Sequence, residues 1–143
     1  MASQQSGALR HVVVVGASLA GLRACESLRE EGFDGTITLV GAEHEIPYDR
    51  PPLSKKVLSG EWEVERIRLR KADDFESLAL ALRLGVRATA VDTHARTLSL
   101  DDGTTVVYDG LILATGASPR KLGVPDAGRV IDEAHAAIAA RLR

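Results

Sequence analysis

The sequence predicts an α/β fold built on a parallel sheet, and three consecutive segments carry this prediction. Residues 10–15 contain four successive valines, a β-branched run that is typical of a strand covered on both faces. Residues 19–31 repeat apolar side chains at three-residue steps from Leu19 to Leu28, which places them on one stripe of a helix. Residues 36–40 form a second apolar strand. Strand, helix and strand within about 30 residues make a βαβ unit, whose crossover is almost always right-handed.

The region after this unit predicts a loop and one short helix. Gly32 is expected just beyond the end of the first helix, where glycine is favoured. Residues 41–52 are too rich in charge, glycine and proline to form a regular element. The proline pair that closes this loop presets a helix start, so a short helix is expected over 53–58.

The middle of the chain predicts short extended and helical segments. Residues 67–70 predict a short strand. Residues 73–78 predict a helix, because two initial aspartates suit its positively polarised end. Residues 80–84 and 87–92 follow as extended segments.

The last third of the chain predicts a hairpin, a strand and a helix. Residues 97–100 and 104–108 alternate in polarity and flank an Asp-Asp-Gly sequence, which is a hairpin turn signal. Residues 111–114 predict another buried strand. Residues 132–143 are rich in alanine and predict a helix.

Length and composition restrict the class of protein. The 143 residues argue for one domain or one incomplete domain, and 45% hydrophobic with 27% charged residues is an ordinary globular composition. The net charge of -2 argues against a basic nucleic-acid surface. No apolar run approaches the roughly 20 residues that span a bilayer. Residues 1–9 are expected to be a disordered leader without the basic start of a secretory signal. With a single cysteine no disulfide is expected, and the simplest location is the cytoplasm.

The junction between the first strand and the first helix carries a nucleotide-binding pattern. Residues 16–21 match G-x-G-x-x-G except that Ser18 replaces the middle glycine. In this pattern Gly16 permits a tight turn, Gly21 lets the helix pack close to the strand, and the backbone N–H groups between them hold a pyrophosphate. Glu43 follows at the spacing of about 20 residues expected for a carboxylate that binds an adenosine ribose. The alternative is a tight turn in a domain that binds no nucleotide.

Three further segments resemble one flavoprotein family. Residues 46–55, Ile-Pro-Tyr-Asp-Arg-Pro-Pro-Leu-Ser-Lys, resemble the Y-x-R-P-P-L-S-K segment of FAD-dependent ferredoxin reductases, which apoptosis-inducing factors share. Residues 111–120 look like the A-T-G-x-x-P-R strand end of the same enzymes, and residues 106–110 are similar to the hairpin exit before it. The resemblance extends over residues 11–122 and is closest to reductases that supply small iron–sulfur ferredoxins in bacterial oxygenase systems.

This resemblance implies a Rossmann-like FAD/NAD(P)-binding domain with a parallel sheet plus a β-hairpin or meander, in truncated form. Residues 10–122 would be the N-terminal part of a split FAD-binding domain, and residues 123–143 a linker and helix that lead to an absent NAD-binding domain. In the family, hydride passes from NAD(P)H to FAD and single electrons leave to an iron–sulfur ferredoxin. The chain is therefore expected to be part of an oxidoreductase and to be inactive by itself, because the NAD(P)H site lies outside it.

The resemblance also implies one catalytic residue and a set of FAD-binding residues. Lys55 would lie against the isoalloxazine ring, where a fixed cation favours the reduced flavin. Arg50 would donate to phosphate or flavin carbonyl oxygens, and either Ala42 or Glu43 would meet the adenosine ribose. The backbone of Ala88 would contact the adenine. The complete set comprises Gly16, Ser18, Ala20, Gly21, Ala42, Glu43, Arg50, Lys55, Ala88, Ala114, Thr115, Gly116 and Arg120.

Several other residues of reactive or aromatic type are expected to be structural. Cys25 lies on the apolar stripe of the first helix and is expected in the core. Trp62 is expected to be a packing anchor on a surface loop. The four histidines are scattered without metal-ligand spacing, so no metal site is expected.

Two other functions stay open on the sequence. One is a non-catalytic nucleotide-binding module or truncated relic, and the other is an NAD-binding dehydrogenase domain. The Arg-Pro-Pro-Leu-Ser-Lys loop and the Ala-Thr-Gly strand end argue against the second, because neither is needed to bind NAD. A truncated sheet would leave a valine-rich edge or an apolar face uncovered, which predicts weak FAD binding, low stability and self-association.

Overall fold

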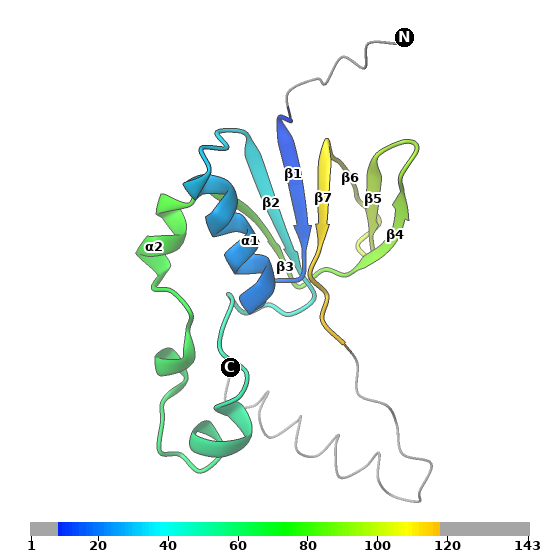
Figure 1. Cartoon of the computed structure of the whole chain (residues 1–143). Coiled ribbons are helices and arrows are strands. Elements are labelled where there is room, and N and C mark those ends of the chain that lie inside the picture. The colour runs from blue at the N-terminus through cyan, green and yellow to red at the C-terminus, as the bar shows by residue number, and fades with distance from the viewer. Residues whose placement is uncertain (1–8, 118–143) are drawn as a thin grey trace, which may run out of the picture.

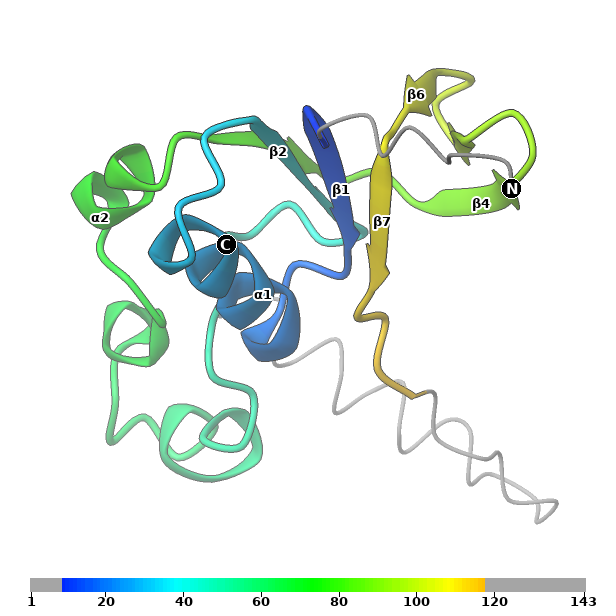
Figure 2. The same ribbon diagram turned by 45° about the horizontal axis from the view of Figure 1, so that its top comes forward.

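Two sheets and a 12-residue helix form the framework of the described part of the chain. A computed structural model describes residues 9–117, except the side chains of residues 72 and 73. The expected leader lies almost entirely outside this range, as do Arg120 and the linker and helix expected near the C-terminus. The parallel sheet stands between the helix and a smaller antiparallel sheet (Figures 1 and 2).

The parallel sheet contains both strands of the predicted βαβ unit and two later strands. Its order is β3 (Leu80–Leu84), β2 (Thr36–Gly41), β1 (His11–Val15) and β7 (Gly110–Leu113). Each neighbouring pair runs parallel. The strands predicted over 10–15, 36–40 and 111–114 are confirmed, and the extended segment over 80–84 proves to be the fourth member of the same sheet.

The valine strand β1 occupies an inner position in this sheet. Val13 lies opposite Thr38 of β2 and Leu111 of β7. The expectation of a valine-rich edge is therefore wrong, because both edges of β1 are hydrogen-bonded. The outer strands of the described sheet are β3 and β7.

The helix and the antiparallel sheet cover opposite faces of the parallel sheet. The helix α1 spans Leu19–Glu30, and the antiparallel sheet has the order β4 (Ala88–Asp92), β5 (Thr97–Leu100) and β6 (Thr105–Val107). β5 and β6 form the predicted hairpin. Gly103 in its turn has a φ of +82°, in the left-handed region that favours glycine.

Successive side chains of β1 point into the two different layers. Val12 and Val14 pack in the cluster that α1 supplies with Cys25, whereas Val13 and Val15 pack against the antiparallel sheet. All four valines are at most 5% exposed. A continuous β-branched run is suited to this position because neither face of the strand meets water.

The end of α1 confirms the prediction for Gly32. Its N–H donates to the carbonyl of Arg29 at 3.0 Å, and the N–H of Phe33 donates to Leu28 at 2.9 Å, which together form a Schellman motif. The Arg29 guanidinium donates to the carbonyl of Phe33 at 2.7 Å and to that of Leu78 at 2.9 Å. The C-terminal end of α1 is therefore tied to the segments that lead into β2 and β3.

Three short helical segments connect β2 to β3 (Figure 1). They are a single π-helical turn η1 (Leu53–Val57), a 3-10 turn η2 (Val64–Ile67) and the short α-helix α2 (Ala72–Ser77). The helices predicted over 53–58 and 73–78 are confirmed in place, although the first has the wider π geometry. Among residues 9–117, no helix has the length and apolar character needed to cross a membrane.

The strand predicted over residues 67–70 is wrong. Ile67 ends η2 and is 2% exposed, because it packs against Val57 of η1. The next residue, Arg68, forms a single bridge to Tyr48 in place of a ladder. The apolar residue Ile67, between charged neighbours, packs in a local cluster of η1 and η2. The alternating pattern by itself does not distinguish such a cluster from a strand.

Candidate functional site

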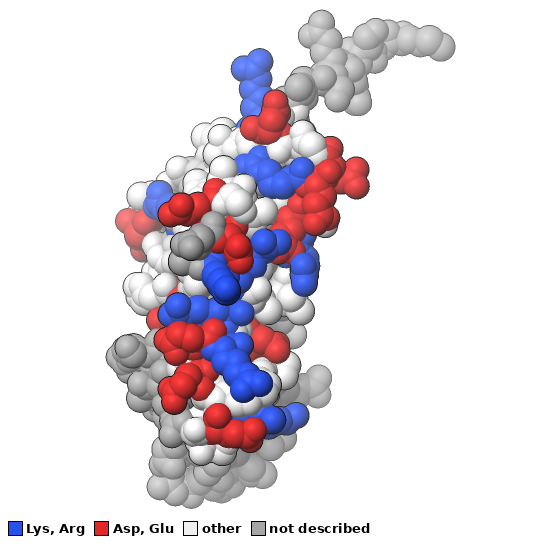
Figure 3. Space-filling model, turned by 90° about the vertical axis from the view of Figure 1, so that its left-hand side faces the viewer, with Lys and Arg blue, Asp and Glu red and all other residues white. Residues whose placement is uncertain are grey.

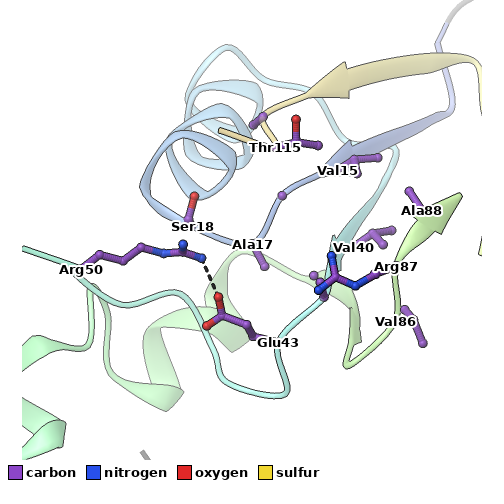
Figure 4. Close-up of a pocket in the computed structure, with 14 residues that line it drawn as sticks. Val15, Ala17, Ser18, Val40, Glu43, Arg50, Val86, Arg87, Ala88 and Thr115 are labelled. Carbon is purple, nitrogen blue, oxygen red and sulfur yellow. Dashed lines mark hydrogen bonds and ion pairs between the residues drawn. The ribbon is translucent and has the colours of Figure 1, made fainter. Parts of the chain in front are cut away.

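A pocket opens at the carboxyl ends of the parallel strands (Figure 4). Its walls come from the turn after β1, the end of β2, the segment before β4 and the residues after β7. Ligands of parallel α/β sheets bind at this edge. The pocket volume is about 190 Å³, below the roughly 300–1,000 Å³ of sites that bury a whole small molecule. It therefore has room for one part of a large ligand.

Two glycines bring backbone segments close together behind this pocket. Gly16 has a φ of +118°, and a Cβ added there would overlap the carbonyl group of Ala114. A Cβ on Gly21 would overlap the carbonyl oxygen of Gly16. The N–H of Gly16 donates to Val40 at 2.8 Å, which fixes the turn against β2. Both positions require glycine, because the backbone of the next strand or turn occupies the place of a side chain.

Ser18 stands at the N-cap of α1. Its φ of -132° lies in the extended region, so this position does not need a glycine. Its side chain makes no capping hydrogen bond, and the first turn of α1 contains no acidic residue. The first N–H groups of a helix lack intrahelical partners and carry partial positive charge. The α1 end of the pocket is therefore suited to an anion.

Glu43, after the end of β2, presents its carboxylate to the same pocket. Its Oε2 accepts a hydrogen bond from the Tyr48 hydroxyl at 2.5 Å, and its Oε1 pairs with Arg50 Nη2 at 2.6 Å. The Glu43 and Arg50 side chains are 45% and 60% exposed, so solvent weakens the attraction between their charges. The pair orients the carboxylate more than it stabilises the fold.

The pKa of Tyr48 is raised above its usual value of about 10. Burial is the largest cause, followed by the hydrogen bond to Glu43 and the charge of that carboxylate. The ring of Tyr48 packs beside the apolar cluster formed by η1 and η2. The phenol is therefore a protonated donor to Glu43 at neutral pH.

The wall opposite Arg50 is the segment that leads into β4. Its backbone is held by a hydrogen bond from Val86 N–H to the Gly41 carbonyl at 3.0 Å. Arg87 N–H donates to Asp101 Oδ1 at 2.9 Å, and Asp101 N–H donates back to the Arg87 carbonyl at 2.9 Å. Figure 4 shows the Arg87 side chain extending from this segment toward Val40, inside the pocket.

Sequence reasoning missed Arg87 as a site residue. The segment over 80–84 was expected to be extended without being placed in the parallel sheet, so the residues after it were not recognised as part of the carboxyl edge. A charged residue within three positions of the end of a parallel strand is the signal that would have identified it. The close approach at Gly41 was also missed, where an added Cβ would lie 2.5 Å from the Cβ of Ala17.

The predicted site residues divide into those that line the pocket and those that do not. Ala20 and Lys55 are exposed on α1 and η1, Gly21 lies behind the turn, and Gly116 follows β7 with a φ of +70°. Arg120 lies outside the described residues. The residues that the structure brings together in the pocket are Gly16, Ser18, Ala42, Glu43, Arg50, Ala88, Ala114 and Thr115.

Cys25 and Trp62, both expected to be structural, pack in apolar clusters. Cys25 is fully buried, and burial raises the pKa of its thiol to about 11, so the reactive thiolate is not formed at neutral pH. Trp62 packs against the cluster of η1 and η2, with Lys56 Nζ at 4.7 Å and Arg66 Cζ at 4.3 Å from its ring centroid. Within residues 9–117, no group of three His, Cys, Asp or Glu side chains could hold a metal ion.

The chemistry of the pocket is that of binding a polar, anionic ligand. The start of α1 and two arginines provide donors, and Glu43 provides an acceptor for hydroxyl groups. Small residues such as Ala42 and Ala88 leave space between these groups.

Comparison with known proteins finds close relatives of this chain. Rhodocoxin reductase from Rhodococcus erythropolis is 46% identical over 116 residues, which cover 81% of this chain and 27% of that protein. The ferredoxin–NAD(+) reductase component of the anthranilate 1,2-dioxygenase system from Burkholderia cepacia is 45% identical over 119 residues, 82% of this chain and 29% of that protein. The chain thus spans less than a third of the length of these curated relatives.

A solved structure and a family model extend this comparison. The covalent putidaredoxin reductase–putidaredoxin complex is similar over 80% of this chain and 28% of the matched chain, with 40% identity and a TM-score of 0.76. The fold is accordingly Rossmann-like, as the resemblance implied. The model of the pyridine nucleotide-disulphide oxidoreductases matches residues 10–142, almost the whole sequence. The chain therefore belongs to the pyridine nucleotide-disulphide oxidoreductase family.

Proposed function

We propose that this chain forms the N-terminal part of the FAD-binding domain of an NAD(P)H-dependent ferredoxin reductase. The observation that carries the proposal is the turn between β1 and α1. Gly16 and Gly21 leave no room for a Cβ, and the start of α1 faces a pocket that also contains a carboxylate. This combination suits the diphosphate and ribose of a dinucleotide.

The residues of the pocket fit the ADP part of FAD. The backbone of residues 16–18 would hold the diphosphate, and Glu43, oriented by Tyr48 and Arg50, would accept hydrogen bonds from the adenosine ribose. Ala42 remains the alternative contact to that ribose. Ala88 would meet the adenine through its backbone. The volume of about 190 Å³ supports a site for this part of FAD rather than for the whole of it.

The remaining residues of the proposal belong to the flavin end of the site. Lys55 would stand beside the isoalloxazine ring, and Ala114, Thr115, Gly116 and Arg120 would close over the cofactor after β7. When bound, FAD supplies the chemistry of accepting a hydride from NAD(P)H and passing on single electrons. A fixed cation at Lys55 would favour the reduced state through its charge.

The partners and boundaries in this proposal come from the family and from the names of relatives. The matched curated proteins include ferredoxin–NAD(+) reductase components, and a matched structure contains putidaredoxin. We infer an iron–sulfur ferredoxin as electron acceptor, the cytoplasm as location, and no nucleic-acid or membrane partner. Residues 10–122 would belong to the FAD-binding domain, and 123–143 would lead toward an NAD-binding domain. Self-association would use the outer strand β7, where Leu113 is 63% exposed.

Calorimetric titration of the 143-residue chain with FAD tests the proposal. We expect heat of binding and movement of the Gly16 amide signal in the NMR spectrum. Gly16→Ala is expected to weaken FAD binding at least tenfold, because the added Cβ meets the Ala114 carbonyl. Gly103→Asn is the matched control, since its left-handed turn lies in open space outside the pocket and asparagine tolerates that conformation.

Two results would contradict the proposal. One is the absence of any heat with FAD in a chain whose circular dichroism shows it to be folded. The other is binding of NAD with higher affinity than FAD, which would favour the NAD-binding dehydrogenase alternative. Circular dichroism of Gly16→Ala distinguishes lost binding from lost folding.

A further inference from the structure

The guanidinium group of Arg87 stands in the pocket. Within residues 9–117 this group makes no hydrogen bond or ion pair; the bonds of Arg87 come from its backbone. The other arginine of the pocket, Arg50, is paired with Glu43 at 2.6 Å. Arg83, a few residues earlier on β3, is paired with Asp102 at 3.0 Å. Arg87 is thus exposed and, in the described part of the chain, has no carboxylate paired with it, whereas Arg50 and Arg83 each have one.

The backbone that carries Arg87 is firmly held, so its side chain starts from a defined place. Two reciprocal hydrogen bonds of 2.9 Å join Arg87 to Asp101. The preceding residues are bonded to the end of β2, through Gly85 N–H to Glu43 O at 2.8 Å and Val86 N–H to Gly41 O at 3.0 Å. Because this backbone is already fixed, ligand binding to Arg87 costs less conformational entropy than binding to a side chain on a mobile loop.

The two arginines approach the pocket from opposite sides (Figure 4). Arg50 comes from the loop after β2 on the side of α1, and Arg87 comes from the segment before β4. Glu43 projects between them. A dinucleotide whose diphosphate binds at α1 and whose ribose binds at Glu43 therefore continues toward Arg87 with its base.

We propose that Arg87 lays its planar guanidinium against the adenine ring and makes the pocket selective for an adenine nucleotide. The inference rests on the proposed function and adds a side chain to it. Guanidinium groups stack on aromatic faces and carry a charge that attracts them. The residues on either side of Arg87, Val86 and Ala88, also line the pocket and are apolar, so no second cation flanks the guanidinium as a phosphate site would favour.

The test compares ligands with and without a base. Wild-type chain, Arg87→Gln, Arg87→Lys and Arg10→Gln are titrated with FAD, ADP and inorganic pyrophosphate at about 0.15 M salt, with heat and the Gly16 amide shift as readouts. Arg10 is the matched control, because it is exposed at the opposite end of β1 and its backbone N–H is likewise held by an aspartate, Asp109, at 2.9 Å.

Arg87→Gln is expected to weaken FAD and ADP by roughly 5- to 30-fold, and pyrophosphate by less than about threefold. Arg87→Lys should also bind ADP more weakly than the wild type, since the lysine ammonium keeps the charge but lacks the planar group that stacks on adenine. Arg10→Gln should bind as the wild type does.

Three outcomes overturn the inference: unchanged ADP affinity in Arg87→Gln, equal losses for ADP and pyrophosphate, or wild-type ADP affinity in Arg87→Lys. Failure of the proposed function looks different. A wild-type chain that binds ADP but not FAD removes the flavin assignment, and the ADP measurements still decide the role of Arg87. A wild-type chain that binds neither removes both.

Discussion

At Glu43, both carboxylate oxygens are engaged before any ligand is considered. Tyr48 donates to one and Arg50 to the other. The family resemblance implied separate roles for Arg50 and Glu43, one toward phosphate or flavin oxygens and one toward ribose. In the structure these two side chains are paired, and we propose that Arg50 orients the carboxylate that would meet the ribose. Each oxygen of a carboxylate has a second lone pair, so Glu43 can still accept from a ligand hydroxyl.

Removal of the Tyr48 hydroxyl tests this orienting role. Tyr48→Phe is expected to weaken FAD binding roughly three- to tenfold, because one hydrogen bond to the carboxylate is lost while the ring stays in its cluster. Tyr108→Phe is the matched control, since its hydroxyl makes a long bond of 3.4 Å to the Asp92 carbonyl. Equal FAD affinity in the two variants, measured by calorimetry, would show that Tyr48 does not position Glu43.

At the scale of single elements, α1 shows how one helix serves both the fold and the site. Its N-cap residue Ser18 lines the pocket, and its last turn is closed by Gly32 in a Schellman motif. Its middle carries Glu26, a carboxylate that is 5% exposed and paired with Arg23 at 2.6 Å and with Arg70. Arg70 comes from the segment before α2, so this bond attaches the long β2–β3 connection to the helix that faces the site.

Glu26 is predicted to contribute to stability in a pH-dependent way. Burial acts to raise the pKa of Glu26, but the hydrogen bonds from Arg70 and Arg23 outweigh it and lower the pKa below the ordinary value. A lowered pKa in the folded state adds stability above the unfolded value of about 4.3, and this is lost as the pH falls through the folded pKa. Wild-type stability should therefore fall in acid.

Glu26→Gln isolates this contribution. We expect the free energy of unfolding to drop by about 1–3 kcal/mol at pH 7, with the difference from wild type shrinking at pH 3. Urea denaturation at both pH values measures it. Glu30→Gln, at an exposed position of the same helix, is the control and should change stability little. A difference between wild type and Glu26→Gln that is the same at both pH values would contradict the account.

At the scale of the whole molecule, three layers meet at one edge. The turn that enters α1, the ends of the parallel strands and the segment leading into the antiparallel sheet each contribute a wall of the pocket. On the face that bears α2, positively and negatively charged side chains are mixed, with Lys and Arg among Asp and Glu (Figure 3). The net charge of -2 agrees with this mixture.

Because the pocket joins all three layers, FAD is predicted to stabilise the entire fold. A ligand that binds only the folded state adds about 2.7 kcal/mol at a concentration one hundred times its Kd. The melting temperature of the 143-residue chain should rise progressively with FAD concentration, as followed by circular dichroism, and Gly16→Ala should respond much less. A melting temperature independent of FAD would count against the site and its central position in the fold.

The strands, the first helix and the glycine turn could be predicted because each depends on residues close together in the sequence. A valine run, a three-residue apolar repeat and a Gly-x-Ser-x-x-Gly turn each restrict the backbone through local sterics and through the burial of one or both faces. The same is true of Gly32 and of the Asp-Asp-Gly hairpin turn. The prediction of a strand at 67–70 was wrong because an apolar residue between charged residues can pack in a local cluster as well as in a strand.

Tertiary structure alone decided which segments meet. The inner position of β1 depends on β7, which arrives almost 100 residues later, and so does the contact of Gly16 with Ala114. The pairing of Arg50 with Glu43 and the presence of Arg87 in the pocket depend on how the loops cross the carboxyl edge of the sheet. Local sequence restricts backbone angles, but neighbours in space are chosen by the burial of all the layers together, which no short pattern contains.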